Sequence, residues 1–297
     1  MTLQQQVKNR NPSGLLNLAI LSVLLLLYAP ILLHWLNGWL YKNISTEHEY
    51  FSHGIIGLPF AAYLGWMNRK KWRRLPDTSH PLGAVLLLLG AVFYLSGVTE
   101  WVNLSLPVIL AGLCLWYKGI SGLRSQGFPL LLVFLATPTA VPYLIAPYTL
   151  PLQSFIAGTA GFILNQFGME VTVDEINLYV GGRIVEVAPY CAGLKMLFTT
   201  LYVGLMLLYW TGALSSRRTT VSFLSIALLI SIIANIIRNT LLTFFHGTGQ
   251  EGAFQWLHEG WGGDLYSACM LVSLVPLLNW INSYFSPSPE TQQQGES

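Results

Sequence analysis

The feature that most constrains this chain is a series of apolar runs, each long enough to cross a lipid bilayer. Runs of roughly 17 to 25 residues recur along its 297 residues, and an α-helix needs about 20 apolar residues to cross about 30 Å of hydrocarbon. Only 9% of the residues are charged and 53% are hydrophobic, whereas soluble domains usually contain about 25% charged residues. We therefore expect an all-α, multi-pass protein whose main solvent is lipid.

Eight of these runs are predicted to span the membrane, as parts of one integral membrane domain over residues 1–285. They lie at 15–36, 54–68, 82–98, 103–117, 128–146, 192–211, 220–245 and 264–283. The apolar stretch 151–167 is short and contains Gln153, Asn165 and Gln166, so we expect it to be an interfacial or re-entrant helix. Residues 286–297 are expected to form a polar, disordered tail.

The basic residues indicate an orientation, because Lys and Arg in short loops are retained on the cytoplasmic side. With eight spans, eleven of the fifteen basic residues fall on one side of the membrane. These are Lys8, Arg10, Arg69, Lys70, Lys71, Arg73, Arg74, Lys118, Arg124, Arg217 and Arg218. Both termini are then inside, and the connections 168–191 and 247–263 are outside.

Residues 169–189 differ from the rest, because polar and β-branched residues alternate around Gly181-Gly182. This pattern predicts a two-strand hairpin with a tight Gly-Gly turn. On the charge-derived topology it forms a small extracytoplasmic roof and leads the chain into Cys191.

Cys191 stands where this extended segment meets the next apolar run. A helix N-terminus has a partial positive charge that lowers the pKa of a thiol from about 8.5, and Lys195, four residues on, would add to this effect. The alternative is a buried, inert cysteine. We expect that alternative for Cys114 and Cys269, which lie inside apolar runs.

Arg238 interrupts the predicted span 220–245. A cation in hydrocarbon costs at least about 3 kcal/mol, so the side chain must face protein or water. It either extends toward the outer headgroups or acts as a fixed donor to a developing oxyanion. Asn235, three residues earlier, shares its helix face and can hold it by hydrogen bonding.

His258 lies in the outer connection 247–263, on the predicted face of Cys191. A histidine in a loop is usually only solvated, which is the expectation for His34, His48, His80 and His246. What distinguishes His258 is its predicted convergence with a thiol and a guanidinium. Nucleophile, base and oxyanion donor together suit acyl transfer.

The order and surroundings of these three residues resemble the exosortase/archaeosortase family, multispan membrane cysteine transpeptidases that process carboxy-terminal sorting signals. The similarity covers most of the chain. It is carried by YFSHG at 50–54, residues 59–66, 129–142 and 151–153, VEVAPYCAGL at 185–194, ANIIRN at 234–239, and His258 with Gly262. Where the family commonly has Cys-Ser-Gly, this chain has Ala192 in the middle position.

The resemblance implies that Cys191 is the nucleophile and that Arg238 and His258 are the other catalytic residues. Asn235, Lys195 and His53 are expected to support them. Family descriptions also allow reversed roles, with Arg238 donating a proton and His258 stabilising the transition state. No cofactor or metal is expected.

The resemblance also implies the partners and the location. Substrates are exported proteins with a short Pro-Glu-Pro type motif, a transmembrane helix and a basic tail, cut near the outer face of the bacterial inner membrane. An exopolysaccharide or a lipid is the expected acceptor. The glutamine-rich tail and the variant around Cys191 are similar to cyanobacterial members.

Two other function classes compete with this interpretation. A transporter or channel should show inverted repeats or paired broken helices, and the sequence shows neither. An enzyme acting on lipid-linked glycans would rely on carboxylates, which are nearly absent from the spans. The net charge of +2 gives no indication of a nucleic-acid partner.

Overall fold

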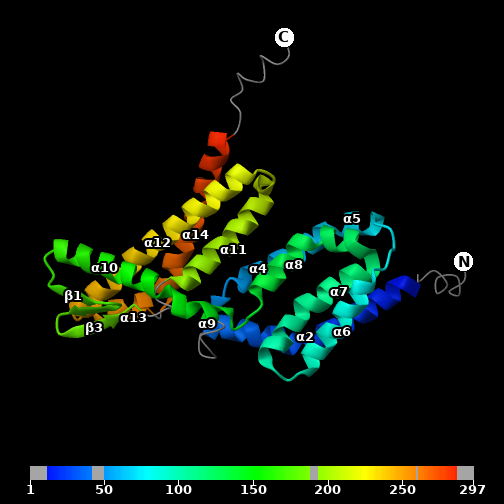
Figure 1. Ribbon diagram of the computed structural model, residues 1–297, viewed down its shortest axis with the longest axis horizontal. Helices are drawn as coiled ribbons and strands as arrows, with labels where there is room; N and C mark the ends of the chain where they lie inside the picture. The colour runs from blue at the N-terminus through cyan, green and yellow to red at the C-terminus, as the bar shows by residue number, and fades with distance from the viewer. Residues whose placement is uncertain (1–11, 42–49, 188–192, 259, 286–297) are drawn as a thin grey trace, which may run out of the picture. The chain divides into compact units, whose positions relative to one another are not determined.

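The computed structural model describes residues 12–41, 50–187, 193–258 and 260–285, which fold mostly into α-helices with one small sheet (Figure 1). The first helices are α2 (Pro12–Tyr41), α4 (Gly54–Met67), α5 (Arg69–Arg74), α6 (Pro81–Leu95), α7 (Thr99–Ser125) and α8 (Gly127–Ala136). They are followed by α9 (Val141–Ile145), α10 (Leu150–Gln166), α11 (Leu194–Trp210), α12 (Arg217–Gly247), α13 (Glu251–His258) and α14 (Trp261–Phe285).

Four helices are long and apolar enough to cross a membrane, namely α2, α7, α12 and α14. Helices α4, α6 and α11 are apolar but shorter, at 10–17 residues. Large apolar side chains cover the outer surfaces of the helices, such as Leu26 at 76% and Val272 at 68% exposure. Such surfaces suit lipid and not water, so the model confirms a helical membrane protein with these candidate spans.

The predicted span 128–146 is broken. Helix α8 ends at Ala136, and the chain bends by 72° before the helical stretch from Val141 to Gln166. Pro138 lies in the break, where a proline has no N–H to continue a helix. Asn103 of α7 donates to the Pro138 carbonyl at 3.0 Å, which satisfies a main-chain acceptor left free by the break. This geometry is that of a broken span or a re-entrant loop.

The contacts divide the chain into two compact units, residues 1–55 with 61–139 and residues 56–60 with 140–297. In the first unit α6 packs closely against α7, because glycines replace side chains at the crossing. A Cβ added to Gly83 would lie 2.6 Å from the Trp116 nitrogen, and one added to Gly90 would lie 2.4 Å from Ile109 Cγ1. Small residues allow such close packing between apolar helices.

The second unit contains an antiparallel sheet of three strands, β1 (Val171–Asp174), β2 (Asn177–Val180) and β3 (Arg183–Glu186), in the order β1-β2-β3. The predicted pairing across Gly181-Gly182 is confirmed, and both glycines have the positive φ that a tight turn needs. The prediction of only two strands was wrong. Strand β1 joins through a turn at Glu175, which adopts a φ of 51°.

The sheet packs on α10 and α12. Its buried side chains Leu178 and Val180 join Ile156 and Ala160 of α10 in one apolar cluster that also includes Ile236 of α12. Gly161 of α10 allows close approach, because a Cβ there would lie 2.4 Å from Val173 Cγ2. A second apolar cluster joins α11, α12 and α14, which lie together in Figure 1. Helix α12 is therefore shared by the sheet and the helical bundle.

Candidate functional site

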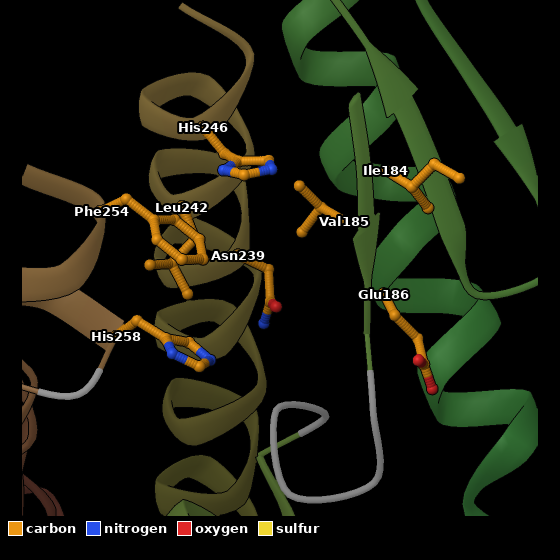
Figure 2. A pocket seen from close by; sticks show the side chains of 8 residues that line it. All are labelled: Ile184, Val185, Glu186, Asn239, Leu242, His246, Phe254 and His258. Atoms are coloured by element: carbon orange, nitrogen blue, oxygen red, sulfur yellow. The ribbon is translucent and has the colours of Figure 1, made fainter. Parts of the chain in front are cut away.

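A cavity of about 110 Å³ lies in the second unit, between β3 and the helices α12 and α13 (Figure 2). Eight residues line it: Ile184, Val185, Glu186, Asn239, Leu242, His246, Phe254 and His258. In Figure 2 the Val185 side chain of β3 points across the cavity toward α12 and α13, whereas the side chains of Ile184 and Glu186 point away from them. Strand β3 thus forms one wall of the cavity. The other wall, formed by α12 and α13, contributes the imidazoles of His246 and His258 and the amide of Asn239.

Arg238 lies on α12 next to this cavity. It is half-buried, and its Nη2 donates to the main-chain oxygens of Leu257 at 3.4 Å and His258 at 3.3 Å. It makes no other hydrogen bond with the residues that the structure describes. These bonds connect the only arginine inside an apolar run to the end of α13. The guanidinium faces protein, as its desolvation cost requires, and retains donors for another acceptor.

His258 is the last residue of α13, a helix within the connection that the sequence suggested was a loop. Its ring stacks on Phe254, with centroids 5.1 Å apart and planes 11° apart. Phe254 in turn contacts His246 at 4.9 Å. Stacking restricts the imidazole to one orientation, so that it faces the cavity.

His246 differs from its expectation as a solvated loop histidine. It lies in the last turn of α12, is half-buried, lines the cavity, and has Nδ1 3.4 Å from Glu251 Oε1. Glu251 also pairs with Arg183, whose Nη1 donates to the His246 carbonyl at 3.0 Å. These contacts fix the start of β3 to the end of α12. No local sequence signal indicated the two contacts of Arg183, because each joins residues more than 60 positions apart.

Asn235 lies one turn before Arg238 and Asn239 and is only 1% exposed. Its Nδ2 and Oδ1 make no hydrogen bond within the described part of the chain, so the expectation that this side chain holds Arg238 by hydrogen bonding was wrong. Instead its side chain contacts Gly193, where a Cβ would lie 2.7 Å from Asn235 Cγ. Gly193 has a φ of 82°, which a residue with a side chain rarely adopts.

Cys191 lies outside the residues that the structure describes. Its described neighbours are Val187, whose N–H donates to Ile176 at 2.9 Å, and Gly193. Helix α11 begins at Leu194, after the left-handed Gly193, so the argument that places Lys195 on a shared helical face with Cys191 does not apply. Lys195 is half-buried in the first turn of α11, and its supporting role stays a prediction.

The remaining expected residues do not line the cavity. Cys114 is partly buried and Cys269 is exposed, and both are free thiols within apolar helices. His53 belongs to the first unit, where it is buried and its Nε2 lies 3.2 Å from the Leu135 carbonyl. Burial lowers the pKa of His53 to about 4. Its supporting role also stays a prediction.

The decisive comparison is with protein-family models. The model described as transmembrane exosortase (Exosortase EpsH) matches residues 35–275, which is most of the chain. The chain belongs to the transmembrane exosortase family. In this exosortase the matched region includes the cavity, Arg238 and His258, as well as the segment that contains Cys191. Neither the curated proteins nor the solved structures gave a match.

Proposed function

We propose that this exosortase is a membrane cysteine peptidase or transpeptidase that cleaves the carboxy-terminal sorting signal of exported proteins. The observation that carries the proposal is the pair of hydrogen bonds from Arg238 to the main chain of Leu257 and His258. They bring a permanent positive charge beside the histidine at the end of α13, at a cavity in a family of cysteine transpeptidases. His258 as the base and Arg238 as the oxyanion donor can then both reach the same scissile carbonyl group.

Cys191 supplies the nucleophile in this proposal. It is two residues from Gly193, and two residues of extended chain cover about 7 Å. Gly193 contacts Asn235, which is one turn from Arg238 on the same helix. Covalent connection and the Gly193 contact therefore support a thiol close to the guanidinium. Cys114 and Cys269 have no histidine or arginine near them in sequence.

The reaction proceeds in two steps. The Cys191 thiolate attacks the scissile carbonyl carbon, and the resulting oxyanion accepts hydrogen bonds from Arg238. The carbon–nitrogen bond then breaks as protonated His258 gives its proton to the leaving amine, which leaves a thioester. Water, or a nucleophilic group of a lipid or polysaccharide acceptor, attacks the thioester while His258 accepts its proton, and the thiolate is released.

The proposed location follows from the charge pattern. Eight spans, counting the short apolar helices, put the exposed basic helix α5 inside and the cavity on the extracytoplasmic face of a bacterial cell membrane. The Pro-Glu-Pro type motif of the proposed substrates is supported by the resemblance to the family, which is most specific around Cys191. The proposed assignment to the cyanobacterial members is supported by the glutamine-rich tail and by Ala192 next to Cys191.

The test is mass spectrometry of a co-expressed candidate substrate. Native enzyme should release a fragment at the sorting signal, whereas Cys191→Ala should leave the substrate intact at normal membrane levels. The matched variants Cys114→Ala and Cys269→Ala should process it normally. Cleavage by Cys191→Ala would refute the proposal.

A further inference from the structure

The outer edge of strand β3 has main-chain groups without hydrogen-bond partners among the residues that the structure describes. In an antiparallel pair, residues alternate between those bonded to the partner strand and those facing away from it. The bond from the Val187 N–H to Ile176 fixes this alternation, so Val185 and Arg183 bond to β2. Ile184 and Glu186 therefore direct their N–H and C=O groups to the outer edge. Neither makes a hydrogen bond there with any residue that the structure describes.

The opposite edge of the sheet is blocked at its start. By the same alternation, Val171 of β1 faces outward, and its N–H and C=O both bond to the Asn165 side chain at 3.0 Å. A side-chain amide thus imitates a neighbouring strand. Proteins usually block exposed edges in such ways, because a free edge pairs with other chains. The β1 edge is thus blocked at Val171, whereas both outward residues of β3 line the cavity.

The cavity lies along this free edge. The β2–β3 turn is held against the end of α12, since a Cβ on Gly181 would lie 2.5 Å from the Gly247 oxygen. Beyond that contact Ile184 and Glu186 line the cavity together with His258 and Asn239. In Figure 2 the side chains of Ile184 and Glu186 point away from the helices, and the Val185 side chain between them points across the cavity. A group bonded to the edge would therefore be presented to the histidine of the proposed site.

We propose that the substrate segment around the scissile bond binds as an added β-strand on the outer edge of β3. This inference rests on the proposed function and specifies how the same site binds its substrate. The free groups of Ile184 and Glu186 repeat every second residue, and an extended peptide is the ligand whose own N–H and C=O groups have this repeat. Main-chain bonds hold the peptide in register, and the register decides which carbonyl meets His258.

The first test uses synthetic sorting-signal peptides in which one amide at a time is N-methylated, with the native enzyme in nanodiscs. Binding is followed by fluorescence anisotropy and cleavage by mass spectrometry. Methylation at alternate residues should weaken binding roughly tenfold, the effect of one lost hydrogen bond, and methylation at the residues between should change it little. Uniform losses, or none, on a peptide that is cleaved would overturn strand addition and leave the proposed function standing. A peptide that is neither bound nor cleaved would overturn both.

The second test changes the enzyme. Ile184→Pro removes an outward N–H, and a proline is tolerated on an edge strand where no ladder bond is lost. It should weaken peptide binding roughly tenfold, whereas Ile184→Ala, which keeps the N–H, should weaken it less. Val173→Pro makes the same change at an outward position of β1 and should bind normally. Equal affinity of Ile184→Pro and Ile184→Ala would overturn the proposal.

Discussion

The guanidinium of Arg238 donates to the main-chain oxygen of His258 at 3.3 Å, across a sequence separation of 20 residues. The bond runs from the middle of an apolar helix to the end of α13. It uses the charge of the arginine without neutralising it, because a carbonyl is an uncharged acceptor. The charge thus remains available to a negatively charged transition state at the cavity.

Arg238→Lys should be severely impaired although it preserves the charge. The guanidinium has a planar set of five donors, enough to hold two carbonyls and an oxyanion together, whereas an ammonium is a compact point charge. Loss of one oxyanion donor typically costs about 100- to 1000-fold in rate. The measurement is single-turnover cleavage of a synthetic peptide, with Arg217→Lys at the exposed start of the same helix as the control. A near-native rate for Arg238→Lys would contradict the assigned role.

His258→Ala should remove the pH limb of the reaction along with most of the rate. Histidine changes its charge between about pH 5 and 8, so a proton-transferring imidazole gives a limb there. The pH–rate profile of purified enzyme decides the point, with His246→Ala as the comparison because His246 contacts Phe254 from the other side. A limb that survives in His258→Ala would favour the reversed roles, with Arg238 as the proton donor.

Thiol labelling should show the sheet and the basic helix on opposite sides. Thr172→Cys, exposed in β1, should react with an impermeant reagent added from outside, and Lys71→Cys in α5 should not, because basic clusters stay in the cytoplasm. The background lacks all three native cysteines and combines Cys114→Ala, Cys191→Ala and Cys269→Ala. Outside labelling at position 71 would reverse the orientation and place the cavity on the cytoplasmic face.

His53 should make the folded protein sensitive to acid. Burial lowers its pKa to about 4, whereas an unfolded histidine has a pKa near 6.5, so the unfolded state binds more protons between these values. The stability that the folded protein gains from keeping His53 neutral is therefore fully present above pH 6.5 and is lost as the pH falls toward 4. Thermal unfolding in detergent should show this decline, and His53→Gln should reduce it. The same change at exposed His34 should leave the decline as it is.

Gly193→Ala should reduce processing more than Gly182→Ala. Both glycines have a positive φ, so both substitutions add left-handed strain of roughly 1 to 2 kcal/mol. Only at Gly193 would the new Cβ collide with a buried residue, Asn235, since Gly182 has open space around it. Processing relative to membrane level is the readout. Equal effects would show that the Asn235 contact is unimportant.

The sequence predicts the helices well, because a membrane helix needs little more than a long apolar run, as in 220–245 and 264–283. It also predicts the β2–β3 turn, since Gly181-Gly182 is a direct local signal. Strand β1 is missed because its turn contains Glu175 in a left-handed conformation that glutamate rarely adopts. The break after α8 is missed although Pro138 lies in it, because apolar residues continue on both sides of the proline.

The candidate site was only partly predictable, for a different reason. Arg238 stands out because a charge inside an apolar run is costly. His258 stands out only because the charge-derived topology places it on the same side of the membrane as Cys191. His246 and Glu186 do not, since their roles come from a strand and two helices that approach only in the folded chain. Long-range contacts of this kind leave no mark on local sequence.

The chain between Val187 and Gly193 is attached at its two ends to different supports. Val187 is hydrogen-bonded to the sheet, and Gly193 is packed against Asn235 of α12. Any sliding of the sheet along α12 therefore changes the distance that the intervening residues must bridge. Cys191 lies within that stretch of the sequence, so under the proposed mechanism a strand added at the edge of the sheet would bear on the position of the nucleophile.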